Sequence, residues 1–187
     1  MADTLSKYIN TLVHLRPVQI WYQLRNRIWC PRYRNLASPA VDSALRLSAP
    51  VVKPSSYDGG TFTFLNVSDT FTCWDDTRHG MLWAYNLNYM DWLLQEGMTF
   101  ETGASWIDRF IDALADNKVG LDPYPSALRI INWIKFISAH FDDIDSDRRK
   151  RWNDSLYSQY IYLSERLEYH LLGNHILEDA YALFIAS

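Results

Sequence analysis

Apolar residues recur at helical spacing through most of the chain after residue 80. Residues 82–95 and 126–140 are apolar on nearly every side, which is typical of helices buried all round. Residues 105–115 and 145–167 instead carry their apolar side chains on one side, and they predict helices with one face in water. Residues 176–185 are again apolar nearly all round. The chain therefore alternates between buried and amphipathic helices.

This alternation predicts a fold class. Helical hairpins placed side by side form an inner layer of buried helices and an outer layer with one wet face. We therefore expect an all-α fold, an incomplete (α/α) toroid of antiparallel helical hairpins, over residues 81–187. Inner helices of a toroid run in one direction, so the segments before them (73–80, 120–126 and 173–175) should converge on one rim. The last inner helix has no outer helix after it, and we expect a chain truncated before the rest of the toroid.

Residues 1–80 are less regular and are predicted to form a basic N-terminal helical arm and a long irregular connection. Apolar stripes predict helices from Asp3 to His14 and from Pro17 to Ile28, the second with proline in its first turn. Prolines, serines and a glycine pair then indicate an irregular connection over residues 31–80. Within it, residues 61–65 alternate briefly like a strand, which we expect to lie along the helical body.

Charge is spread unevenly along the chain. The net charge is −4. Residues 1–35 carry six basic side chains against Asp3 alone, a net charge of +5, so the remainder carries −9. The basic arm fits an anionic partner, which the charge alone leaves open among polysaccharide, membrane and nucleic acid. The alternative is a solvated helix face docked on the acidic body.

Composition narrows the classes further. Aromatic residues make up 15% of the chain, and their flat faces suit either stacking on sugar rings or a large aromatic core. No run of eighteen apolar residues exists, so we expect no membrane span. Residues 1–15 lack the features of a secretory signal, which predicts a cytoplasmic protein and leaves a periplasmic location open. Cys30 and Cys73 have no metal-like spacing and fit two reduced thiols or one disulfide. We expect no metal and no cofactor.

Three stretches resemble the N-terminal helical domain of the heparinase II/III-like polysaccharide lyase family. They are residues 82–89 (LWAYNLNY), 122–134 (DPYPSALRIINWI) and 173–179 (GNHILED), and residues 15–20 also look like the start of such proteins. The resemblance implies a toroid followed by β-sheets, and β-elimination on an anionic, uronate-containing polysaccharide or oligosaccharide. It also implies that the catalytic tyrosine and another histidine lie in a missing C-terminal portion, so that these 187 residues alone are inactive. No nucleic-acid partner is expected.

The resemblance implies a site as well. Asn174 and His175 match the family's Asn-His pair, in which Asn174 would hold the substrate carboxylate and His175 would assist neutralisation or proton transfer. The alternative is a helix N-cap and a buried ring. Arg129 is the expected charged contact to a sugar carboxylate or sulfate, unless it pairs with Asp122. Further substrate-binding candidates are Tyr124, Asn88, Tyr89, Asn132 and Trp83, with core packing as the alternative for the tryptophan. The family pattern has a histidine where Asn88 stands.

A second reading of the same residues remains open. It is a non-catalytic or biosynthetic glycan-binding protein of surface-polysaccharide assembly, such as capsule or O-antigen assembly, which would use the same rim as a groove.

Overall fold

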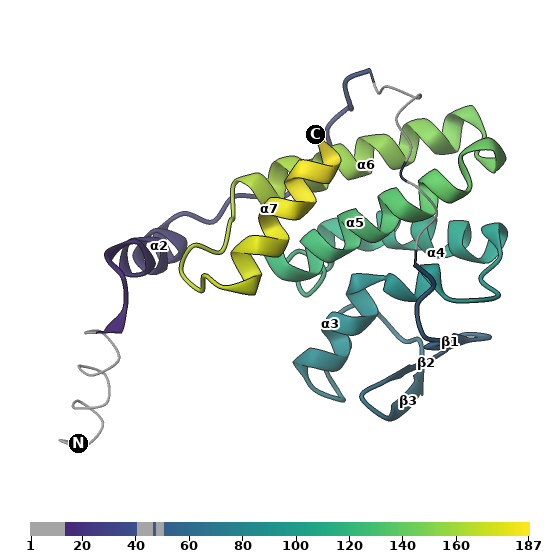
Figure 1. Ribbon diagram of the computed structural model, residues 1–187, viewed down its shortest axis with the longest axis horizontal. Coiled ribbons are helices and arrows are strands. Elements are labelled where there is room, and N and C mark those ends of the chain that lie inside the picture. Colours follow the sequence, from purple (N-terminus) through teal and green to yellow (C-terminus); the bar gives the residue numbers. More distant parts are fainter. Residues whose placement is uncertain (1–13, 41–46, 48–50) are drawn as a thin grey trace.

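The computed structural model describes residues 14–40, 47 and 51–187. The helix predicted from Asp3 therefore lies outside the described residues, apart from its final position. The described elements form a helical body with a small sheet at one end, and α2 lies at the other end of the molecule (Figure 1). In order they are α2 (Pro17–Ile28), β1 (Tyr57–Asp58), β2 (Thr61–Phe64), β3 (Val67–Thr70), α3 (Met81–Tyr89), η1 (Asp91–Leu94), α4 (Phe100–Ala113), η2 (Leu114–Asp116), α5 (Pro123–Ala139), η3 (Phe141–Asp143), α6 (Ser146–Ser164) and α7 (Asn174–Ala186).

The prediction of an all-α toroid is wrong, because residues 57–70 form a three-stranded antiparallel sheet of order β1-β2-β3. Two tight turns close it, at residues 59–60 and at residues 65–66, and all four turn residues have positive φ. Two-residue turns of this kind match the twist of a hairpin. The sequence pattern detected only β2, because β3 (VSDT) carries no apolar alternation and is largely exposed.

The sheet packs its apolar face into an aromatic core. Phe62 and Phe64 are buried, and their rings contact Trp92 at 5.0 Å and Trp83 at 5.3 Å respectively. Six tryptophans in all are buried: Trp74, Trp83, Trp92, Trp106, Trp133 and Trp152. Core packing therefore accounts for most of the tryptophan content.

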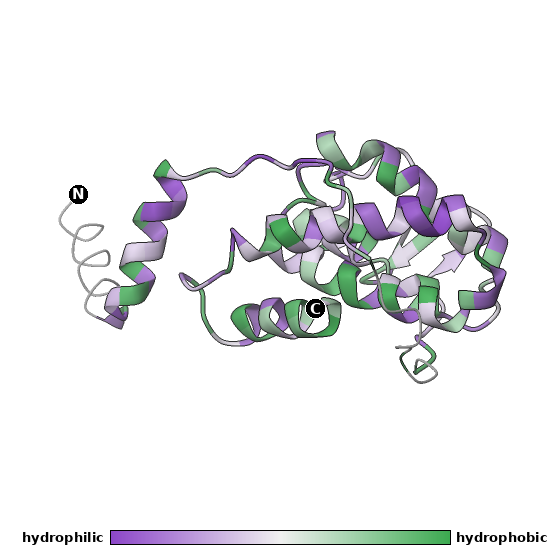
Figure 2. Ribbon diagram, turned by 90° about the horizontal axis from the view of Figure 1, so that it is seen from above, coloured by the Kyte–Doolittle hydropathy of each residue, from purple (hydrophilic) through white to green (hydrophobic). Residues whose placement is uncertain are grey.

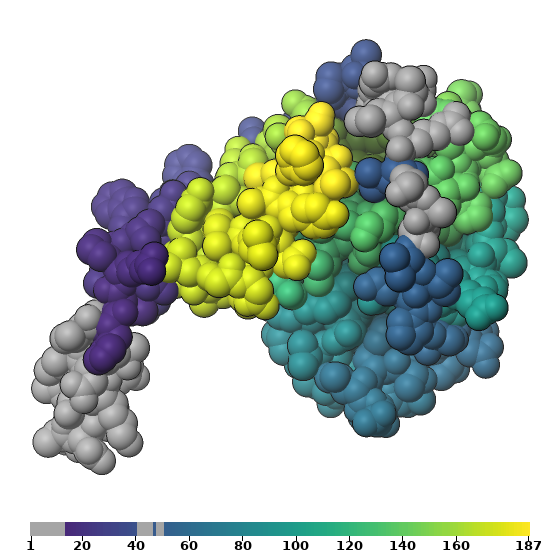
Figure 3. Space-filling view, viewed as in Figure 1, coloured from purple at the N-terminus to yellow at the C-terminus, as the bar shows by residue number. Residues whose placement is uncertain are grey.

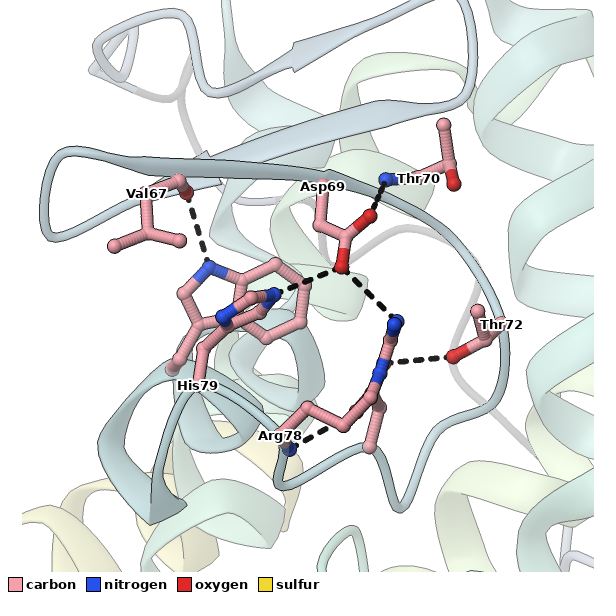
Figure 4. Close-up of polar contacts among 8 residues, drawn as sticks. Val67, Asp69, Thr70, Thr72, Arg78 and His79 are labelled. Carbon is pink, nitrogen blue, oxygen red and sulfur yellow. Dashed lines mark hydrogen bonds and ion pairs between the residues drawn. The ribbon is translucent and has the colours of Figure 1, made fainter.

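A cluster of charged side chains fastens β3 to the loop before α3 (Figure 4). Asp69 accepts from His79 at 2.8 Å and pairs with Arg78 at 3.0 Å. Arg78 also pairs with the buried Asp76. These contacts hold the pKa of Asp69 and of Asp76 below their ordinary values, with the hydrogen bond from His79 as the main cause for the first and that from Arg78 for the second. The loop is thus held by ionised carboxylates at neutral pH.

The helical body follows the predicted order with shifted boundaries. The helix predicted over residues 82–95 ends at Tyr89, because Met90 adopts a left-handed conformation and a 3₁₀ turn follows. The predicted helix near Ser105 begins earlier, at Phe100, after a Thr99 side chain that accepts from the Thr102 N–H. The predicted start of α6 is confirmed, since the Asp145 side chain caps it.

Helix α7 differs from the prediction of a helix buried all round. Only Asp179 and Ala182 of its side chains are buried, although α7 packs against α5 and α6. Leu177, Tyr181 and Phe184 are exposed, and the apolar colour of α7 in Figure 2 extends to its outer side. Helical periodicity reports how apolar a helix is, but not which neighbours cover it.

Two further findings concern the whole described chain. Cys30 and Cys73 are free and exposed, as the reading of two thiols predicts. Among residues 14–40, 47 and 51–187, no helix has both the length and the apolar character that crossing a bilayer requires.

Candidate functional site

A cleft of about 230 Å³ lies where the N-terminal ends of α5 and α7 meet the segment that follows α2. Its lining comes from both ends of the sequence, and in Figure 3 the segment before α7 lies beside α2. The lining residues are Asn26, Trp29, Cys30, Pro31, Tyr85, Asp122, Pro123, Tyr124, Glu165, Arg166, Glu168, His170 and His175. Such a mixture of aromatic faces and convergent polar groups is the usual character of a ligand site.

Two of the three segments predicted to share a rim meet at this cleft. The rings of Tyr124 and His175 lie 4.5 Å apart, and the Asn174 side chain lies near enough to the Tyr124 hydroxyl to lower its pKa in part. Residues 73–80 contribute no lining residue. They attach to the adjoining segment instead, where Asp75 accepts from the N–H of Val119 at 2.8 Å.

Asn174 is not the N-cap of α7. That position belongs to Gly173, whose φ of 64° is natural only for glycine, and Asn174 is the first helical residue. The Asn174 side chain is exposed and makes no capping bond, so its amide remains available to a ligand. The N–H groups of the first turn lie beside it, and they carry the partial positive charge of the helix end.

His175 is oriented by Glu168. Its Nδ1 lies 2.9 Å from Oε2 of Glu168, which is buried in the segment between α6 and α7. A carboxylate oxygen accepts hydrogen bonds, so Nδ1 donates here, and in the neutral form of the ring Nε2 is then the acceptor. About a third of the His175 side chain is exposed, which leaves the ring accessible from the cleft.

Asp179 lies behind this pair and anchors Glu168. Its Oδ2 accepts from the Glu168 backbone N–H at 2.8 Å, while Oδ1 is buried without a hydrogen-bond partner among the described residues. Burial raises the pKa of Asp179 to about 7, and the charge of Glu168 adds to the shift. A buried, partly unsatisfied carboxyl group is costly when ionised, so Asp179 prefers to stay protonated below neutral pH.

The tyrosines of the cleft are proton donors. The Tyr85 hydroxyl donates to Asp122 at 2.8 Å, and burial, followed by Asp122, raises the pKa of Tyr85. Burial also raises the pKa of Tyr124, with the charge of Glu178 as the next cause. A phenol whose pKa is raised remains protonated near neutral pH and donates to ligand oxygens.

Arg129, predicted to contact a sugar carboxylate, lies in the core and not at the cleft. Its side chain is fully buried, with Nε donating to Gln159 at 2.7 Å and the guanidinium 4.3 Å from the ring centre of Phe110. Burial lowers its pKa to about 9. Asp122 is bonded to Tyr85 instead. The structure thus gives Arg129 a packing role between α5 and α6.

Three other predicted contacts also point into the core. Asn88 donates to the Trp74 carbonyl and accepts from Asn117, both at 2.8 Å. Asn132 donates to the Tyr89 carbonyl at 2.9 Å. Trp83 donates to the Val67 carbonyl, in agreement with the packing alternative for that residue.

Tyr89 lies between the core and the cleft. It is half-buried, and its ring meets the edge of Tyr124 at 5.9 Å. Burial raises the pKa of Tyr89, so its phenol also stays protonated at neutral pH.

The prediction missed one wall and most of the charges of the cleft. Residues 26–31 form the wall, and their sequence gives no sign that they reach a site so far along the chain. Glu165 and Glu168 face Arg166, whose guanidinium donates to the Leu121 carbonyl at 2.8 Å. Acidic side chains therefore outnumber basic ones around the cleft.

In the described part of the chain, no three side chains of the His, Cys, Asp or Glu type are arranged so that they could hold a metal ion together. The lining offers aromatic faces, hydroxyl groups and carboxylates, which can pack against a ligand and exchange hydrogen bonds with it. Comparison with protein-family models, curated proteins and solved structures found no match to the chain.

Proposed function

We propose that this chain forms a carbohydrate-binding cleft whose ligand is a uronate-containing glycan of the kind cleaved by β-elimination. One observation carries the proposal: Tyr124 and His175 line a single open cleft at the start of α7, and the exposed Asn174 lies beside them. These are the three side-chain types that such a reaction uses. The resemblance of residues 173–179 to a polysaccharide lyase family supports the same conclusion.

The binding mode follows from the end of α7. A sugar carboxylate accepts from the Asn174 amide and from the first-turn N–H groups, where the helix end favours an anion. Trp29 lines the opposite wall and is 56% exposed, so its ring offers a flat face to a sugar. Hydrogen bonds to a charged group are stronger than neutral ones, and they strengthen further as charge develops on the carboxylate.

The reaction removes a proton from the uronate and then breaks its glycosidic bond. The Nε2 atom of His175 takes the proton from C5, and the electron pair of that bond forms the C4=C5 double bond. The bond from C4 to the glycosidic oxygen breaks, and the Tyr124 phenol gives its proton to the departing oxygen. Asn174 stabilises the charge that builds on the carboxylate in between. The raised pKa of Tyr124 keeps the phenol protonated at neutral pH, while it also makes the phenol a weaker acid.

A second candidate function rests on the charge of the cleft. Asp122, Glu165 and Glu168 line it, whereas the predicted carboxylate partner Arg129 is buried elsewhere. Carboxylates accept hydrogen bonds from sugar hydroxyls but repel a uronate. These observations favour a neutral glycan, bound without cleavage by a protein of surface-polysaccharide assembly.

Titration with two ligand sets separates the candidates. We would follow the His175 ring by NMR while adding oligouronates or neutral oligosaccharides of equal length. If a uronate binds at α7, Asn174→Ala weakens oligouronate binding about tenfold or more, since a hydrogen bond to a charged group contributes roughly 1.5–3 kcal/mol. The control variant, Asn35→Ala, removes an exposed amide that does not line the cleft and leaves binding unchanged.

The outcomes discriminate clearly. Binding of neutral sugars alone supports the second candidate, and binding of neither set overturns both. Formation of an ultraviolet-absorbing unsaturated product from a uronate polymer, lost in Tyr124→Phe, would add the catalytic step and would overturn the expectation that these 187 residues alone are inactive.

A further inference from the structure

Helix α2 contacts the body through polar side chains, and its apolar face lies toward solvent. Gln19 donates to the His170 carbonyl at 3.2 Å, and the Asn26 amide donates to Nδ1 of His170 at 3.3 Å. The apolar side chains point the other way. Trp21, Leu24 and Ile28 are 65%, 52% and 88% exposed. This is the reverse of the usual arrangement for a helix on a globular body.

The exposed apolar residues form one stripe. At 3.6 residues per turn, Leu24, Ile28 and Trp21 fall within about 60° of arc. Arg25 and Arg27 flank the stripe, one on each side, about 40° and 60° beyond its edges. Figure 2 shows apolar and polar bands alternating around α2, and Figure 3 shows the helix at one end of the molecule.

The charged side chains of α2 and of the segment that follows it are all basic. Residues 14–40 contain five arginines and no aspartate or glutamate. Since residues 1–13 hold one Asp and one Lys and the whole chain has a net charge of −4, residues 41–187 carry −9. A basic helix therefore stands at the end of an acidic body.

We infer that α2 is an interfacial helix that binds the surface of an anionic lipid bilayer. The apolar stripe enters the boundary between headgroups and acyl chains, and the exposed Arg27 contacts lipid phosphates, whereas Arg25 donates to the Glu165 carbonyl at 3.4 Å and is held toward the body. The acidic body is repelled by the same surface, which leaves α2 as the part that lies on the membrane. This inference does not depend on the proposed function.

The charge of α2 favours an anionic bilayer over a second copy of the chain or a nucleic acid as its partner. In a symmetric dimer through α2, the same patch of two copies would meet, and the arginines that flank one stripe would face those of the other. Nucleic acid would satisfy the arginines but leave the apolar stripe in water. A bilayer with anionic headgroups matches both features together.

Co-sedimentation of the full chain with vesicles tests the inference. We expect binding to vesicles of equal parts phosphatidylcholine and phosphatidylglycerol, no binding to phosphatidylcholine alone, and a bound fraction that falls as salt is added. The double variant Leu24→Gln/Ile28→Gln reduces partitioning tenfold or more, and Arg27→Gln reduces it about fivefold.

The matched control replaces two exposed apolar side chains on a different helix. Leu177→Gln/Phe184→Gln alters two α7 side chains that are 66% and 76% exposed, and binding stays unchanged. Because no described side chain of α2 is buried, the α2 variants keep the fold, which thermal unfolding verifies.

Three results overturn the inference. The first is absence of binding to the anionic vesicles. The second is an equal loss of binding in the α7 control. The third is self-association in solution, without vesicle binding, that the α2 double variant abolishes, which would make α2 a dimer interface.

Discussion

The buried carboxyl group of Asp179 gives the sharpest test of how the site is built. Its pKa of about 7 in the folded chain compares with an ordinary value of 3.8, a gap of about three units. At about 1.4 kcal/mol per unit this gap corresponds to roughly 4 kcal/mol. Relaxation around the carboxyl group reduces the effect, so about 2–4 kcal/mol is expected.

The sign follows from proton binding. Between pH 3.8 and 7 the unfolded chain has released the proton while the folded chain still holds it. The folded state therefore binds more protons in this range, and stability falls as the pH rises through it. The cost of ionising the buried carboxyl group is absent below the unfolded pKa and reaches its full size once the pH exceeds about 7.

The substitution Asp179→Asn removes the titration while keeping an oxygen for the Glu168 N–H. We expect the variant to be about as stable as the parent at pH 5, or up to about 1 kcal/mol weaker if its amide N–H groups lack acceptors. Between pH 5 and pH 8 only the two units up to about pH 7 contribute, so the difference should move by about 1.5–3 kcal/mol in favour of the variant.

Urea unfolding at both pH values, followed by tryptophan fluorescence, measures this difference. Other titrating groups cancel because parent and variant share them. Asp116→Asn, at an exposed carboxylate far from α7, is the control and should show no such change. A difference that stays constant between pH 5 and pH 8, or that moves toward the parent, would refute the account of Asp179.

Two further predictions concern packing and orientation. Glu168→Ala leaves Nδ1 of His175 without its acceptor, so the ring should change from the single Nδ1–H tautomer to a mixture of tautomers, which ¹⁵N NMR detects. The control Glu178→Ala should leave the tautomer unchanged. Gly103→Ala places a Cβ 2.6 Å from Cε2 of Phe136 in the core. This overlap should lower the free energy of unfolding, measured with urea, by about 1–3 kcal/mol. An unchanged free energy would show that the Phe136 ring moves freely.

Local signals in the sequence were sufficient for most helix starts. Pro17 and Asp145 mark the beginnings of α2 and α6 because proline and aspartate act within the first turn itself. The break at Met90 carried no such signal, since nothing about methionine favours a left-handed backbone. Strand β3 was missed because its partners, and not its own side chains, make it a strand.

The candidate site was predictable where its residues are neighbours in short motifs. Tyr124 and the Asn174-His175 pair stand at helix starts, and the direction of the helices brought them together. Arg129 could not be placed, because its partner Gln159 lies thirty residues away on another helix. A polar residue on an otherwise apolar helix can face either a cleft or a satisfied core, and only the packing of distant elements decides between them.

The cleft is assembled from two parts of the chain that differ in how firmly they are held. One wall belongs to α5 and α7, and the other belongs to residues 26–31, which include the last turn of α2, a helix with no buried side chain among those described. Detaching that second wall exposes little apolar surface, so it is a low-energy subglobal opening and not part of global unfolding. A ligand that touches both walls must therefore tighten the arm by mass action. The α2 amides should therefore exchange more slowly when a ligand fills the cleft, although α2 forms only one edge of it.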